Sequence, residues 1–540
     1  MLLVVRNGAT LDRTLSLLQV LRADVPEIRF TIDAGSSFDL GLQRHIESLG
    51  FEVLSWKEAT DEHFDVILAT QASKRLAELH GFKIVCAHGA GYNRLVPKST
   101  GSDTVATGLV RDQLMVGGEV IPDLIFVSHA EQIDRLRLGC PEAAERAVVL
   151  GDPVFYRIKE SEFARDRFRQ RFELTGRQKL VVVSSTWGPY GGLGSHDDLI
   201  PQLLVQLPVH EYRLAAILHP NIWAGHTPAE IKLFLEDYCD AGLVYIPPRT
   251  PWEAAVIAAD IVLGDHGSVS YYGAALGRPL LLIADGSQEL DPASPPARLC
   301  REGDHLDLTK DLLPQIDRAF STHDPAKAAA ITEAMFQEQD RSWEIFRNAI
   351  LQAAARPLPK GRPRMIRVDD PEPSPSRSLT AWKVSPKLAY RENNPVIEIR
   401  CLPKIVAREV DAYRERTLRI ADAAEYYLTV TAQDEVDRAC RDNTDVMLHM
   451  GPLRTADGEQ WASEIFTGRT ATLAGYVGNG GCMLRWIDGP GLFVAHGDVL
   501  IAAAAAYRWR EEELPIDLPF TVEVDVGGEL IKLDMSPLEA

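Results

Sequence analysis

Several short stretches of the chain combine histidine, serine and acidic residues in a pattern that suits phosphate chemistry. The richest lies in residues 258–279 and contains Asp265, His266, Gly267, Ser268 and Ser270. An apolar run precedes these residues and a helical pattern follows them. Free backbone N–H groups and the helix dipole favour a phosphate at such a position, and serine hydroxyls add hydrogen bonds. The stretch therefore predicts a phosphate site, with a helix-capping role for Ser268 as the alternative.

Two histidines also stand directly after apolar runs. His219 follows the run 214–218, and Pro220 fixes the turn after it. His88 follows the run 83–87 and precedes Gly89. The unperturbed pKa of histidine is near neutral, which suits a general base. We expect His88 to act as a catalytic base, and a structural role is the alternative for either histidine.

A third set of candidate residues, Ser185, Thr186 and Gly188, stands at the end of the apolar run that starts at residue 179. Runs of this kind are typical of parallel strands buried on both faces. Ligands of open α/β sheets collect at the carboxyl ends of such strands. We therefore expect these residues to lie on the same sheet edge as His219 and Asp265.

The absence of other motifs narrows the chemistry. The sequence has no G-K dipeptide, no G-x-S-x-G, no H-E-x-x-H and no D-x-D. These absences argue against P-loop hydrolysis, the usual lipase elbow and zincin chemistry. The missing D-x-D also argues against metal-dependent glycosyl transfer, so we expect neither a metal site nor a resident cofactor.

The elements that position these residues suggest an α/β fold with two Rossmann-like domains facing a cleft. Short apolar runs alternate with helical patterns up to about residue 150, and the alternation restarts at residue 179. A stretch rich in proline follows and predicts a semi-extended linker. We divide the chain into an N-terminal Rossmann-like domain (1–153), a second Rossmann-like domain with closing helices (154–355), the linker (356–380) and an α+β module of unknown role (381–540).

The composition of the chain limits the classes of partner that we expect it to bind. The 540 residues carry 57 Lys plus Arg against 77 Asp plus Glu, a formal net charge of −20, which argues against a dedicated nucleic-acid or anionic-membrane binder. The seven cysteines are dispersed singly, and no apolar stretch is long enough to span a bilayer. We expect a cytoplasmic protein without a transmembrane segment, whose C-terminal module is free to engage a protein partner.

In their order along the chain, these motifs resemble the CDP-glycerol glycerophosphotransferases, the teichoic-acid polymerases with a two-domain GT-B glycosyltransferase fold. The resemblance covers roughly residues 1–350 and is carried by His88-Gly89, Ser185-Thr-Trp187, His219-Pro220 and Asp265-x-x-Ser268-x-Ser270. It implies that His219, Ser268 and Ser270 hold the phosphates of a CDP- or UDP-linked donor. It also implies that His88 activates the hydroxyl group of the acceptor, with 1–153 as the acceptor domain and 154–355 as the nucleotide-donor domain.

The leading hypothesis is a metal-independent transferase that moves a glycosyl or glycerophosphate-type group from a nucleotide-activated donor. A UDP-sugar epimerase of the same fold is the second hypothesis, favoured by an acidic, histidine-rich cleft that acts on one substrate. A non-catalytic nucleotide-binding scaffold is the third, favoured by a tightly bound but unreactive nucleotide.

Overall fold

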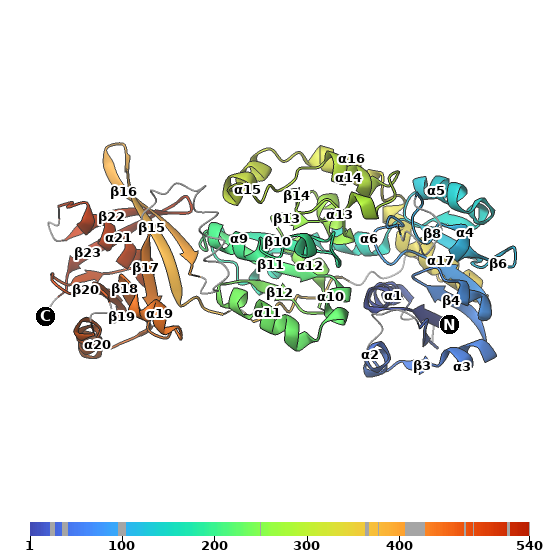
Figure 1. The fold of residues 1–540 in the computed structure, drawn as a ribbon, viewed down its shortest axis with the longest axis horizontal. Helices are drawn as coiled ribbons and strands as arrows, with labels where there is room; N and C mark the ends of the chain where they lie inside the picture. Colours follow the sequence, from blue (N-terminus) through green and yellow to red (C-terminus); the bar gives the residue numbers. More distant parts are fainter. Residues whose placement is uncertain are drawn as a thin grey trace.

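Three bodies follow one another along the molecule (Figure 1). The N-terminus lies in the body at one end and the C-terminus in the body at the other. The computed structural model describes residues 1–21, 27–34, 41–95, 104–248, 250–361, 367–375, 377–404, 427–468, 471–478, 480–515 and 519–538. No helix within these ranges is both long and apolar enough to cross a lipid bilayer.

The first body is a seven-stranded parallel sheet in the order β3-β2-β1-β4-β5-β8-β9. Its strands are β1 (Leu2–Val5), β2 (Arg29–Ile32), β3 (Glu52–Leu54), β4 (His63–Ala69), β5 (His80–Val85), β8 (Leu124–Val127) and β9 (Ala147–Val149). A small hairpin joins β6 (Met115–Val116) to β7 (Glu119–Val120). The helices of this body are α1 (Gly8–Leu21), α2 (Leu42–Ser48), α3 (Trp56–Asp61), α4 (Arg111–Leu114) and α5 (Glu131–Gly139).

The second body is a five-stranded parallel sheet in the order β12-β11-β10-β13-β14. Its strands are β10 (Lys179–Ser185), β11 (Tyr212–Leu218), β12 (Val244–Ile246), β13 (Ile261–Gly264) and β14 (Leu280–Leu282). Its helices are α6 (Pro153–Glu160), α7 (Arg165–Arg171), α8 (Gly192–Ser195), α9 (Leu199–Gln206), α10 (Pro220–Gly225), α11 (Pro228–Asp240), α12 (Trp252–Ala258), α13 (Ser268–Ala275), α14 (Pro295–Glu302), α15 (Leu312–Ser321) and α16 (Pro325–Glu333). Two parallel sheets with helices packed on their faces confirm the expected α/β architecture.

The last helix before the linker belongs to the first body. Helix α17 (Ser342–Ala353) places Trp343, Phe346 and Ile350 in the core that surrounds β1 and β4. Figure 1 shows α17 beside β8 and β4, far from β11. The sequence analysis assigned all of residues 154–355, closing helices included, to the second domain. That assignment was wrong for α17. The apolar face of this helix does not reveal which of two sheets it covers.

Part of the proline-rich linker is bound to the second body. The N–H of Ser374 donates to the carbonyl of Tyr245 at 2.8 Å, and the N–H of Tyr245 donates to Ser374 Oγ at 2.9 Å. Val368 is buried, and its N–H donates to Ser161 Oγ at 3.0 Å. The segment 367–375 is thus bonded to the edge strand β12 at Ser374 and to the end of α6 at Val368, and it does not run free as a spacer.

The third body is a closed nine-stranded barrel, so the expected α+β module was wrong in its architecture. Helix α21 (Val499–Glu511) lies in the core of the barrel, and its five consecutive alanines, 502–506, are all buried against the surrounding strands. Small side chains let the strands approach the helix on every side. The strands are β15 (Ala381–Arg391), β16 (Asn394–Pro403), β17 (Leu428–Ala432), β18 (Val446–Pro452), β19 (Leu473–Gly478), β20 (Gly481–Trp486), β21 (Leu492–Val494), β22 (Phe520–Val526) and β23 (Glu529–Pro537), with α19 (Arg438–Asp442) and α20 (Thr455–Thr467) outside.

Candidate active site

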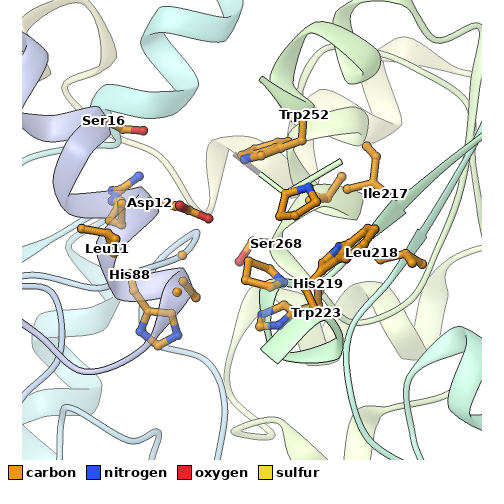
Figure 2. Close-up of a pocket in the computed structure, with 18 of the residues that line it drawn as sticks. Leu11, Asp12, Ser16, His88, Ile217, Leu218, His219, Trp223, Trp252 and Ser268 are labelled. Carbon is orange, nitrogen blue, oxygen red and sulfur yellow. The ribbon is translucent and has the colours of Figure 1, made fainter. Parts of the chain in front are cut away.

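A cleft of about 1160 Å³ lies between the first and second bodies. It is lined by loops at the carboxyl ends of strands from both sheets, the edge where open α/β sheets bind their ligands. Figure 2 shows Leu11, Asp12 and His88 on one wall and His219, Trp252 and Ser268 on the other. The two strand-end histidines of the sequence analysis therefore share one cavity, although they lie 131 positions apart in the chain (219 − 88).

His88 lies on the first wall, three residues beyond the end of β5. The residue is exposed to the cleft. The protein atoms around the imidazole and the positive charges of Arg13 and Arg94 lower the pKa of His88 to about 4, and a hydrogen bond to the Thr70 backbone opposes this shift. The imidazole is therefore unprotonated at neutral pH and able to accept a proton.

His219 lies on the opposite wall, directly after β11. Its Nδ1 atom accepts a hydrogen bond from the N–H of Asn221 at 3.0 Å, so the proton of the neutral ring is on Nε2. Burial lowers the pKa of His219 to about 3, and the charges of His88 and Arg94 contribute to this shift. His219 thus offers one neutral N–H donor, next to Pro220 on the same wall.

The first turn of α13 forms the centre of the second wall, where Gly267, Ser268 and Val269 line the cleft. The N-cap residue is Gly267 and not Ser268, so the capping alternative for Ser268 was wrong. The Ser268 hydroxyl instead accepts a hydrogen bond from the Ala90 N–H of the first body at 3.1 Å. A Cβ atom at Gly89 would lie 2.4 Å from Ser268 Oγ, so this close approach requires the glycine that follows His88.

Ser270 does not line the cleft. Its side chain is fully buried and faces β13, where a Cβ atom at Gly264 would lie 2.2 Å from Ser270 Oγ. No hydrogen-bond partner of this hydroxyl is present in the described part of the chain. The prediction that Ser270 binds the donor phosphate is therefore not supported by its position.

Asp265 is also fully buried and does not line the cleft. Its carboxylate accepts hydrogen bonds from the N–H groups of Thr186, Gly192 and Gly267, at 2.7, 2.8 and 2.9 Å. Burial raises the pKa of Asp265 despite these donors. Asp265 therefore ties the loop after β10 to the start of α13, which makes it a positioning residue for the second wall.

Hydrogen bonds within the loop after β10 also fix its conformation. The Ser185 hydroxyl donates to the carbonyl of Thr186 at 2.9 Å and accepts from the N–H of Leu193 at 2.9 Å. Ser185 and Thr186 line the cleft, whereas Gly188 does not and adopts φ 92°, which favours glycine. Of these three predicted residues, two contribute to the wall and Gly188 supports the turn.

His266 belongs to a polar chain that joins the two bodies. Its Nε2 atom lies 2.9 Å from Glu289, and Glu289 forms an ion pair with Arg94 of the first body at 2.7 Å. The Arg94 guanidinium also lies over the Trp187 ring, 4.5 Å from its centroid. Sequence reasoning missed Arg94 because its ion-pair partner is 195 residues away and no local pattern marks it.

The arginines of the cleft are all neutralised. Arg13 pairs with Asp152 at 2.9 Å, Arg94 pairs with Glu289, and Arg157 pairs with Glu253. Within the described chain, the cleft wall has neither a lysine nor an unpaired arginine. A bound anion would therefore rest on neutral donors, namely the His219 Nε2–H and the backbone of α13. In the same ranges, no group of three histidine, cysteine or acidic side chains is placed to hold a metal ion.

The chain is similar in structure to the wall teichoic acid polymerase TagF. One TagF structure, of a variant soaked with CDPG, has 13% identity and a TM-score of 0.44, over 66% of this chain and 88% of that one. HepE of Anabaena in complex with UDP has 14% identity and a TM-score of 0.36, over 66% and 99%. A glycosyltransferase from Rickettsia africae ESF-5 has 10% identity and a TM-score of 0.37, over 65% and 97%.

The expected similarity to teichoic-acid polymerases is thus met among solved structures. No protein-family model matches the chain, and no curated protein matches it.

Proposed function

We propose that this protein is a metal-independent transferase that moves a glycosyl or glycerophosphate-type group from a nucleotide-activated donor to an acceptor hydroxyl. One observation carries the proposal: an unprotonated histidine on one wall of the cleft faces an N–H donor and a helix start on the other. This arrangement can keep a base for the acceptor apart from the anion-binding groups for the donor.

In the proposed reaction, the donor diphosphate lies against the first turn of α13 and the His219 Nε2–H. The acceptor oxygen attacks the transferred group while its proton passes to His88. For a glycosyl donor, the bond from the sugar carbon to phosphate oxygen breaks and the nucleoside diphosphate leaves. For a glycerophosphate donor, the anhydride P–O bond breaks and the nucleoside monophosphate leaves. His88 then returns the proton to water.

Calorimetry with CDP, UDP and GDP tests the first half of the proposal, which is that the cleft binds a nucleoside diphosphate. A thermal-shift assay gives a second readout, because a nucleotide that binds only the folded protein raises its thermal stability. We expect at least one nucleoside diphosphate to bind, and His219→Ala to weaken that binding. Failure of all three to bind would overturn the proposal.

Consumption of the matching activated donor tests the second half. We expect turnover to survive EDTA, since the leaving group would be stabilised by fixed N–H donors. Complete loss of turnover in EDTA, restored by magnesium or manganese, would overturn metal independence. Binding without turnover would instead favour the nucleotide-binding scaffold.

A further inference from the structure

A second pocket, of about 380 Å³, lies at the edge of the second sheet opposite the cleft. Strands β10, β13 and β14 begin at this pocket, whereas the loops that follow β10 and β13 line the cleft. Because β10 has seven residues, each rising about 3.3 Å, roughly 20 Å separates the pocket from the cleft. The start of α7 and the end of α15 complete the pocket. Its lining residues include Arg165, Lys179, Asp260, Arg278, Phe320 and His323.

Positive charge exceeds negative charge in the wall of this pocket. Among the described residues that line it, Arg165, Lys179 and Arg278 stand against the single carboxylate of Asp260. Asp260 is also shared with a neighbour outside the wall, because its two oxygens lie 2.6 Å from Arg165 and 2.5 Å from Arg169. The wall therefore keeps an excess of two positive charges.

Two of these cations, Arg165 and Arg278, are held side by side. Nε of Arg165 and Nη2 of Arg278 donate to the same oxygen, the carbonyl of Ile257, each at 3.2 Å. Burial and the neighbouring charge of Arg165 lower the pKa of Arg278. Arg278 pairs with Glu162 at 2.8 Å, and counting Glu162 together with Arg169 leaves the excess charge unchanged. The two guanidinium groups repel each other, and an anion bound beside them would relieve that repulsion.

Lys179 is the third cation of the wall. Its Nζ atom lies 4.3 Å from the ring centroid of Phe320 and 5.3 Å from that of Tyr212. Asp317, which accepts the Tyr212 hydroxyl at 2.7 Å, and Glu211 are two acidic groups nearby, and neither lines the pocket. The faces of the two rings attract the ammonium group but are weak acceptors of its hydrogen bonds. Lys179 therefore keeps N–H donors for an anion in the pocket.

We infer that this pocket binds a phosphate oxyanion, either free phosphate or a phosphate monoester, at a site separate from the cleft. Guanidinium groups bind the oxygens of such anions in pairs, and an ammonium group adds a point charge. A phosphate group carries about 1.5 to 2 negative charges at neutral pH, which matches the excess charge of the wall better than a monocarboxylate does. The net charge of −20 argues against a nucleic-acid strand as the source of the phosphate. This inference is independent of the proposed function.

Calorimetric titration of the intact protein with sodium phosphate, glucose 6-phosphate and sodium acetate, at constant ionic strength, tests the inference. We expect at least one of the two phosphates to bind about tenfold or more tightly than acetate. Tighter binding of glucose 6-phosphate than of phosphate identifies a monoester as the ligand, and otherwise the site takes free phosphate. Acetate binding as tight as that of the phosphates, or no binding of either phosphate, would overturn the inference and leave the proposed transferase intact.

Variants of the wall locate the anion. Lys179→Gln and Arg278→Gln each remove one positive charge of the pocket, and Lys387→Gln, at an exposed position on β15, is the matched control. We expect each pocket variant to weaken phosphate binding about tenfold or more, the contribution of one hydrogen bond to a charged group, and the control to leave it unchanged.

Lys179→Gln keeps this test valid if Arg278→Gln fails to fold, because Lys179 forms no ion pair within the described ranges. Unchanged phosphate binding in every pocket variant that folds would overturn the inference. A loss of binding confined to His219→Ala would place the anion in the cleft and overturn it as well.

Discussion

The two walls of the cleft use their polar groups differently. Polar side chains that support the second wall are already bonded: Asp265, behind the wall, accepts from three backbone N–H groups, and Ser185 joins two segments of its own loop. What remains open to a ligand is mainly backbone at α13 and one nitrogen of His219. On the first wall, His88 is exposed, and its ring forms a hydrogen bond with the Thr70 backbone. A wall with fixed donors suits binding, and a wall with one exposed base suits proton transfer.

The largest effect expected from this difference is that of His88→Ala. Loss of a positioned base reduces turnover by about 10²- to 10⁴-fold. Donor binding, which depends on the opposite wall, should remain unchanged in calorimetry. The control is His80→Ala, an exposed histidine at the opposite end of the same strand β5, which should keep full turnover. Full turnover in His88→Ala with the true acceptor would remove the catalytic role from the first wall.

A smaller but still large effect is expected from Asp265→Asn. The amide presents its NH₂ group either to the N–H groups of Thr186 and Gly192 or to that of Gly267, so at least one bond becomes a clash of donors. Hydrogen bonds to a charged group contribute about 1.5 to 3 kcal/mol each and are not additive, so we expect the free energy of unfolding to fall by about 2 to 4 kcal/mol. Urea unfolding measures this. Asp304→Asn, at an exposed position, should leave it within about 0.5 kcal/mol.

The sequence was sufficient for the sheets and for the edge on which His88 and His219 lie. Strand β11 is almost fully buried and β5 is buried at its last two residues, so each histidine follows apolar residues that end a strand. It was insufficient for the direction of individual side chains. Ser268 and Ser270 are two positions apart on a helix, a rotation of about 200°, so they cannot both face the cleft. The positions of α17, Arg94 and the linker in the fold depend on contacts with residues far along the chain, and no local sequence pattern encodes such contacts.

The pH dependence of stability tests whether both histidines are neutral in the folded protein. The pKa values of His88 and His219 are lowered to about 4 and about 3, below the usual 6.5. The unfolded chain therefore takes up protons at these positions below about pH 6.5, while the folded chain does not until the pH approaches 4. Stability should accordingly fall as the pH falls through this window. Urea unfolding at pH 7, 6 and 5 should show a shallower decline in His219→Gln than in the unaltered protein, and an unaltered decline in His80→Gln. Identical slopes in all three proteins would show that His219 is not held neutral by folding.

The smallest expected effect distinguishes two serines on one helix. Ser268 lines the cleft and accepts the Ala90 N–H, whereas Ser270 faces β13 from the buried side of α13. Ser268→Ala should therefore weaken nucleotide binding by about 0.5 to 1.5 kcal/mol, or up to about 3 if its hydroxyl meets a charged phosphate. Ser270→Ala removes a buried hydroxyl without a described partner, so affinity should be unchanged and stability should not fall appreciably. Calorimetry with the best nucleotide compares the two variants directly. Equal losses would mean that both serines act through the helix itself, and no loss in Ser268→Ala would limit the second wall to His219 and the backbone of α13.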